Sequence, residues 1–75
     1  MANVIDFGGI VRFHRKRAKL SQKDLADLAG VGKTVIFDIE KGKETVKLIT
    51  LMKVLDTLNI RMEFNSPLMN EFNNN

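Results

Sequence analysis

The sequence contains no cysteine and a single histidine, His14. Disulfide scaffolds, cysteine-based zinc sites and thiol nucleophiles are therefore excluded, and so is a metal site built from several histidines. No apolar run approaches the roughly 20 residues that cross a membrane, and no signal-peptide core is present. These absences predict a soluble, cytoplasmic protein with no metal, no cofactor and no association with a membrane.

The chain is also short for an enzyme. A chain of this size buries only about 60% of its unfolded surface, which leaves little room for both a core and a deep cleft. No nucleophile, base and orienting group stand in a recognisable arrangement. The run from Gly30 to Thr34, GVGKT, matches the end of a nucleotide-binding loop, but Asp27 stands where that motif requires glycine. We therefore predict that the protein is not an enzyme and that dimerisation enlarges its core.

Basic residues are concentrated in one stretch of the chain. The net charge is +3, but residues 12–23 carry six basic side chains and no acidic one, whereas residues 24–42 have a net charge of −2. Such a cluster suits a polyanion such as DNA. The alternative is a solvated helix face, which charge alone does not exclude.

The scarcity of proline leaves long segments with helical spacing. The one proline, Pro67, lies near the C-terminus. Apolar residues recur at intervals of three and four, which predicts helices near residues 6–18, 21–29, 33–41 and 47–58. The positions that carry this pattern are Phe7, Ile10, Val11 and His14; Leu25, Ala26, Leu28 and Ala29; Val31, Val35, Ile36 and Ile39; and Leu48, Leu51, Met52, Leu55 and Leu58.

Capping residues mark several of the expected helix ends. Asp6 can cap the first helix, and Ser21 with Asp24 resembles a capping box at the start of the second. Gly30 and Gly42 follow the second and third helices, where glycine readily takes the left-handed conformation that ends a helix.

After the fourth helix the periodicity changes from helical to two. Ile60, Met62 and Phe64 alternate with polar residues, which predicts a strand over residues 60–65. A lone strand leaves backbone groups unpaired along both edges. We expect it to pair antiparallel with the same strand of a second copy across a two-fold axis. The Asn-rich segment 66–75 is predicted to be a flexible tail.

Two short helices joined by a glycine turn form a helix-turn-helix. The segment from Leu20 to Gly42, LSQKDLADLAGVGKTVIFDIEKG, closely resembles the phage-repressor-like (Cro/C1, also called XRE) helix-turn-helix family. The cap, the glutamine, the Leu-Ala pair, the turn and the Ile-Glu-x-Gly ending are all in register, and the resemblance covers roughly residues 7–60. It implies an all-α, four- to five-helix lambda-repressor-like domain that binds double-stranded DNA.

The resemblance implies roles for residues around the third helix. Gln22 matches the glutamine that binds a backbone phosphate at a helix N-terminus. Lys41 and Lys43, just beyond the third helix, would meet phosphates. Arg15 and Glu40 match a pair that the family joins by a structural salt bridge between the first and third helices.

Four residues match the groove-facing positions of the recognition helix: Lys33, Thr34, Phe37 and Asp38. Lys33 could donate to guanine, Phe37 could pack on thymine methyl groups and Asp38 could accept from cytosine. Phe37 is unusual where the family generally has a polar residue, so a place in the core or in an interface remains open for it. The family usually has glycine at Lys19 and a hydroxyl residue at Gly32, so this chain departs from it in both turns.

The segment beyond the fourth helix looks like that of the HipB-type antitoxins, whose dimer is closed by a small sheet formed from the C-terminal strands. We therefore predict a helix-turn-helix domain over residues 1–65, with a dimerisation strand at 60–65 that uses Ile60, Met62 and Phe64. The resemblance implies a homodimeric repressor that binds a palindromic operator, autoregulates its operon and binds a HipA-like serine/threonine kinase toxin.

Two alternatives remain at this stage. The first is a plain repressor of phage or restriction-controller type without a toxin. The second is a protein-interaction module that no longer binds DNA, which the acidic residues Asp24, Asp27 and Asp38 and the aromatic Phe37 mildly favour. Copurification with a kinase would separate the antitoxin from the plain repressor, and loss of salt-dependent DNA binding would favour the interaction module.

Overall fold

Four helices begin and end close to where the sequence predicts. The computed structural model describes residues 5–74, and within that part of the chain it contains five helices and no strand. Their bounds are α1 Phe7–Arg17, α2 Gln22–Ala29, α3 Lys33–Glu40, α4 Leu48–Thr57 and α5 Met69–Asn73. No helix in residues 5–74 is long and apolar enough to cross a membrane.

The predicted N-terminal caps of α1 and α2 are confirmed. The Asp6 carboxylate accepts a hydrogen bond from the Gly9 N–H at 2.8 Å. At α2 the Ser21 hydroxyl accepts from the Asp24 N–H at 2.9 Å, and the Asp24 carboxylate accepts from the Ser21 N–H at 3.0 Å. These bonds satisfy N–H groups that have no partner within the helix.

The turns around α2 and α3 use the left-handed backbone region. Gly30 has φ of 72° and Gly42 has φ of 88°, as the sequence predicts. Lys19, between α1 and α2, also has a positive φ, 61°. The turn therefore keeps the conformation that glycine would adopt most easily, and the lysine bears a steric cost of about 1 kcal/mol.

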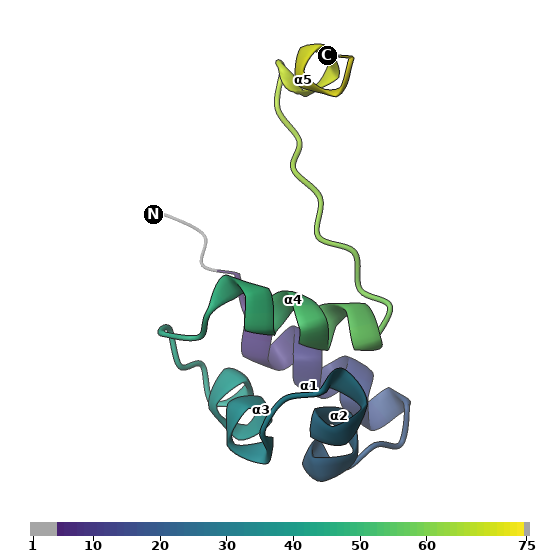
Figure 1. Ribbon diagram of the computed structural model, residues 1–75, viewed down its shortest axis with the longest axis vertical. Coiled ribbons are helices and arrows are strands. Elements are labelled where there is room, and N and C mark those ends of the chain that lie inside the picture. Colours follow the sequence, from purple (N-terminus) through teal and green to yellow (C-terminus); the bar gives the residue numbers. More distant parts are fainter. Residues whose placement is uncertain (1–4, 75) are drawn as a thin grey trace.

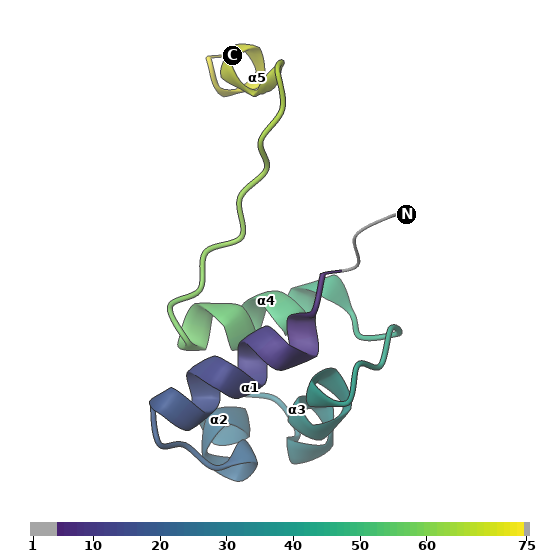
Figure 2. The ribbon, with the colours of Figure 1, turned by 180° about the vertical axis from the view of Figure 1, so that it is seen from behind.

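Helices α1 to α4 enclose one hydrophobic core. In Figures 1 and 2, α4 lies on one side of this bundle, α2 and α3 lie on the other, and α1 runs between them. Each of the four helices contributes fully or almost fully buried apolar side chains. These residues are Val11, Leu25, Ala26, Ile36, Ile39, Leu51, Val54 and Leu55.

Helix α1 faces the core with a narrower surface than its apolar pattern suggests. Phe7 and Ile10 are each 37% exposed, and the buried positions are Gly8, Val11 and Arg15. Gly8 explains this orientation, because a Cβ atom there would lie 2.5 Å from the carbonyl oxygen of Ile39 in α3. Helix α1 thus approaches the end of α3 along a surface that only glycine permits.

Three residues that were expected on the inward faces of their helices lie at the surface. They are Leu28 in α2 and Leu48 and Met52 in α4. Conversely Val54, which was expected only to flank the apolar face of α4, is fully buried. Helix α4 meets the rest of the bundle on the side of Leu51, Val54 and Leu55, so its opposite side remains exposed.

The C-terminal segment differs from the prediction. Residues 60–65 form no strand within the described chain, since they pair with no other segment, and their proposed pairing with a second copy stays a prediction. Residues 60–66 run away from the bundle without regular secondary structure, and α5 follows them after a turn (Figures 1 and 2). The sequence did not predict α5, which buries none of its residues.

Candidate nucleic-acid interface

Helices α2 and α3 form the helix-turn-helix unit. A sharp turn at Gly30 to Gly32 separates them, and the Val31 N–H donates to the Ala26 carbonyl at 3.0 Å. Leu25 and Ala26 of α2 pack with Ile36 of α3 in the core. The turn and the buried contacts together set the angle at which α3 presents its outer face.

A buried polar cluster ties α3 to α1 and α2. Two Arg15 nitrogens bind the Glu40 carboxylate, Nε at 2.6 Å from Oε2 and Nη2 at 2.9 Å from Oε1. Their side chains are only 10% and 5% exposed. A third Arg15 nitrogen, Nη1, donates to the Leu20 carbonyl at 2.9 Å, and Gln22 Nε2 donates to Glu40 Oε1 at 3.3 Å. The end of α3 is therefore held to α1 and to the start of α2.

The cluster keeps both charges ionised. Burial of the Glu40 carboxylate favours its neutral form, but hydrogen bonds from Arg15 and Gln22 outweigh this, so the pKa of Glu40 lies below its ordinary value. The hydrogen bond to Glu40 is also the main reason why the pKa of Arg15 is raised. A bidentate pair at this depth stabilises the arrangement only while both partners remain.

The outer face of α3 is polar, with one aromatic residue. Lys33 and Thr34 are exposed in the first turn, and Gly32 caps the helix without a side-chain hydrogen bond. Phe37 is 46% exposed and lies on the same face, with Lys41 Nζ 5.1 Å from its ring centroid. Phe37 is therefore a surface residue, which excludes a place in the core.

Asp38 and Gln22 already have partners within the chain. The Asp38 carboxylate lies 3.4 Å from Lys43 Nζ, in a partly exposed pair. Gln22, expected at a phosphate, is half-buried and donates to Glu40. Four of the predicted DNA-binding residues are thus exposed on or next to α3, and their side chains make no hydrogen bond or ion pair with another described residue: Lys33, Thr34, Phe37 and Lys41.

A hollow beside α3 brings in residues that the sequence did not single out. Thr45, Lys47 and Thr50 line it together with Asp38 and Lys43. Lys47 occupies the N-cap position of α4, and no side chain caps that helix. An uncapped helix start and two lysines thus lie at one hollow, an arrangement that suits a phosphate. The uncapped helix start after the Lys-Glu-Thr run is the signal that could have revealed it.

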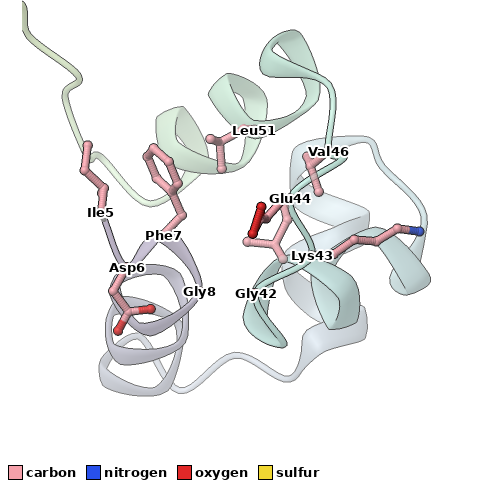
Figure 3. Close-up of a pocket in the computed structure, with 10 residues that line it drawn as sticks. Ile5, Asp6, Phe7, Gly8, Gly42, Lys43, Glu44, Val46 and Leu51 are labelled. Atoms are coloured by element: carbon pink, nitrogen blue, oxygen red, sulfur yellow. The ribbon is translucent and has the colours of Figure 1, made fainter. Parts of the chain in front are cut away.

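A larger groove lies between the starts of α1 and α4 and the loop after α3, and we call it the α1–α4 groove (Figure 3). It encloses about 790 Å³. Phe7 and Leu51 form one wall, and Glu44 and Val46 stand on the other (Figure 3). Its predominantly apolar walls are unlike the polar outer face of α3.

The dimerisation residues of the sequence prediction separate into two groups. Ile60 and Met62 are partly buried against the edge of the core of their own chain. Phe64 is 73% exposed and lies further along the extended segment. The described part of one chain therefore shows where these residues lie, and their role in a dimer stays a prediction.

Comparison with known sequences identifies related proteins. Residues 11–65 match the family model described as Helix-turn-helix. An uncharacterized HTH-type transcriptional regulator of Sinorhizobium fredii (strain NBRC 101917 / NGR234), y4mF, is 40% identical over 62 residues, which make up 83% of this chain and 82% of that protein.

Solved structures with the same fold include two kinds of protein. The restriction-modification controller protein C.AhdI from Aeromonas hydrophila is 32% identical, with a TM-score of 0.68 over 76% of this chain and 86% of that chain. A chain of the HipA-HipB-O2-O3 complex is 19% identical, with a TM-score of 0.74 over 89% of this chain and 97% of its own. A chain of the HipB-O4 20mer complex is also 19% identical, with a TM-score of 0.73 over 89% of this chain and 97% of that chain. At this identity HipB shares the fold, and the likeness carries nothing further.

Proposed function

This chain belongs to the helix-turn-helix family, and on that premise we propose that it is a homodimeric transcriptional repressor that binds a specific DNA sequence. The family match confirms the resemblance that the sequence indicates. The outer face of α3 carries the proposal: it presents Lys33, Thr34 and Phe37 after a tight turn, where a recognition helix meets base edges.

Lys33, Thr34 and Phe37 would read the bases. A lysine in the first turn can donate to guanine O6 and N7, and a threonine can donate or accept. Phe37 would place its ring against thymine methyl groups. Asp38 would contribute to base selection only where Lys43 turns to a phosphate and releases its carboxylate.

Phosphate contacts would supply most of the affinity. Lys41 and Lys43 lie beyond α3, and Lys47 with the free N–H groups of α4 lies beside them. Such contacts position a protein on DNA without reading its sequence, and their strength falls with salt. Gln22 would hold the end of α3 in place through Glu40 and reach a phosphate only by leaving that bond.

The proposed dimer pairs residues 60–65 of two copies antiparallel, with Ile60, Met62 and Phe64 on one face. A two-fold axis would present two α3 helices to one side of a duplex, with half-sites about 34 Å apart or a multiple of that. The operator is then expected to be palindromic.

A selection experiment tests DNA binding directly. Binding sites are selected from a random duplex pool at fixed salt with the wild-type chain and with Lys33→Ala. We expect a two-fold symmetric site whose base preference relaxes in the variant. Lys43→Ala should instead weaken all sequences alike and lower the salt slope by about one, while Lys53→Ala on α4 serves as the control. No enriched site would contradict the proposal and favour a protein-interaction module.

Within this function, we propose the antitoxin of a HipA/HipB-like toxin–antitoxin module that autoregulates its operon. What supports it is the alternating segment 60–65 after α4, which in sequence looks like that of the HipB-type antitoxins; the structural likeness to HipB, at 19% identity, shows the fold alone. The higher identity of the controller, 32%, favours the second candidate, a repressor without a toxin. Coexpression with the neighbouring genes distinguishes these two candidates. A serine/threonine kinase that copurifies with the chain supports the antitoxin, whereas a dimer that binds its operator without such a partner supports the repressor without a toxin.

A further inference from the structure

The chain exposes more surface than a compact chain of its size. Its accessible surface is 6206 Å², whereas the mass scaling of folded monomers gives about 4,700 Å² for 75 residues. The excess of about 1,500 Å² is larger than the roughly 800 Å² that each partner buries in an interface of standard size. The single chain therefore holds enough uncovered surface for a stable dimer.

Part of the exposed apolar surface lies at the C-terminal end. Leu68 and Phe72 are 66% and 72% exposed. They lie one helical turn apart, since the Phe72 N–H donates to the Leu68 carbonyl at 3.2 Å, and both therefore face the same side of α5. A short amphipathic helix that buries none of its residues needs an apolar surface to hold it.

The α1–α4 groove offers such a surface. Phe7 (37% exposed) and Ile5 (61% exposed) stand on its α1 side, Leu51 lies beside Phe7, and Val46 adds apolar surface on the opposite wall (Figure 3). No segment of residues 5–74 fills it. It lies at the start of α4, whereas residues 59–68 leave from the end of α4 (Figure 1).

We propose that α5 of one chain docks in the α1–α4 groove of a second copy, so that the two C-terminal segments are exchanged. If residues 60–65 of the two chains pair antiparallel, the residues that follow them in each chain run back towards the α4 helix of the partner. Residues 66–69 form a turn, in which the Met69 N–H donates to the Ser66 carbonyl at 3.2 Å, and α5 follows at once. The groove extends to Leu51, so the distance to cover along the partner's α4 from Leu58 is about 10 Å, and the five residues of α5 supply about 7 Å of it. Helix α5 can therefore reach the partner's groove.

The arrangement is closed and symmetric. Two identical α5–groove contacts and one pair of strands cover the apolar residues of both C-terminal segments, so no apolar C-terminal end is left to bind a third copy. The inference rests on the proposed homodimer and adds to it a second interface, distinct from the strand pair.

Cross-linking can locate α5 because the chain has no cysteine of its own. Glu44→Cys in the groove and Asn73→Cys at the end of α5 are made in separate, differently tagged full-length chains, which are mixed, exchanged and oxidised. We expect a disulfide-linked mixed dimer. The control replaces Glu44→Cys with Leu28→Cys, which is 64% exposed on α2, and should give no such product.

A companion measurement separates the two interfaces. Sedimentation equilibrium of the wild type reports the dimer itself, and the selection experiment reports DNA binding independently. A dimer without the groove cross-link overturns the exchange while leaving the strand-paired repressor intact. A monomer overturns both the exchange and the proposed dimer. A chain with both cysteines that links only within itself also overturns the exchange, because α5 would then occupy its own groove.

Charge substitutions give a second readout. Leu68→Asp with Phe72→Asp should raise the dimer dissociation constant by about 100-fold, since each buried apolar side chain contributes at least a factor of ten. Asn70→Asp with Asn73→Asp adds the same charge to the same helix on other positions and should leave the constant within about threefold. Equal effects of the two pairs would contradict the docking of this face.

Discussion

The helical body, residues 7–58, and the C-terminal arm, residues 59–74, differ in how much of their surface is buried within the chain. Among the described residues, the body contains all of the buried apolar side chains, the buried ion pair of Arg15 and Glu40, and the capping box of Ser21 and Asp24. The arm contains one short helix with no buried residue, joined by an extended segment. The contrast teaches that the 52 residues of the body form a core through contacts within the chain, whereas the arm adds only Ile60 and Met62 to the edge of that core.

Glu40→Ala should break the body most severely. The change leaves Arg15 buried without its partner, so we expect the free energy of unfolding to fall by about 3–5 kcal/mol. Chemical denaturation measures it. The matched control is Asp27→Ala in the exposed pair with Lys23, which should cost at most about 0.5 kcal/mol. A loss below 1 kcal/mol for Glu40→Ala would show that the Arg15–Glu40 pair contributes little to the stability of the body.

Gly8→Ala tests the close approach of α1 and α3. The new methyl group would meet the backbone oxygens of Ile39 and Glu40 at 2.5 and 2.9 Å, so the helices must separate. We expect a loss of about 1–3 kcal/mol in thermal or chemical unfolding. An increase in stability, as the better helix propensity of alanine alone would give, would show that α1 is free to shift.

Glu63→Pro tests whether the arm needs a partner. Proline cannot donate to a strand ladder, so the dimer should weaken at least about tenfold in sedimentation equilibrium, while the helical circular dichroism of the body stays unchanged. Glu63→Lys keeps the N–H group and is the control. If both variants or neither weaken the dimer, hydrogen bonding by residues 60–65 does not hold it together.

Lys19→Gly should strengthen the body. Lys19 has a φ of 61°, so glycine relieves strain there, and we expect a gain of about 1 kcal/mol. The same change at Lys16, inside α1, should cost about 1 kcal/mol because glycine is a poor helix former. Parallel thermal melts of the two variants measure both; shifts of the same sign would contradict the left-handed turn.

Acid should weaken the body through Glu40. Its pKa is lowered by folding, so its stabilisation is complete above the unfolded value, about 4.3, and is lost as the pH falls through the lower folded value. Denaturation of the wild type between pH 7 and 3 should show this loss. Glu40→Gln should show a shallower decline; because Asp24, whose pKa is also lowered, is common to both chains, parallel curves would mean that Glu40 does not contribute.

Much of the body could be predicted from the sequence. The spacing of apolar residues located α1 to α4, and the caps at Asp6 and Ser21 follow from side chains within three residues of the groups that they bind. The Arg15–Glu40 bond was expected only through the family resemblance, because nothing local joins residues 25 positions apart.

The candidate interface could be predicted less completely. The exposed positions Lys33 and Thr34 follow from the helix pattern, whereas the exposure of Phe37 depends on how α3 packs. The inward bond of Gln22 and the hollow around Thr45 and Lys47 depend on neighbours from other helices.

The sequence by itself therefore determined where the helices lie and which family they form, because periodicity, caps and turns are properties of near neighbours. Only the tertiary structure decided that Gly8 brings α1 against α3, that Leu28 and Met52 stay exposed, and that α5 leaves the body while a groove stays open. The physical reason is that burial depends on the approach of residues distant in the chain, which no local pattern specifies.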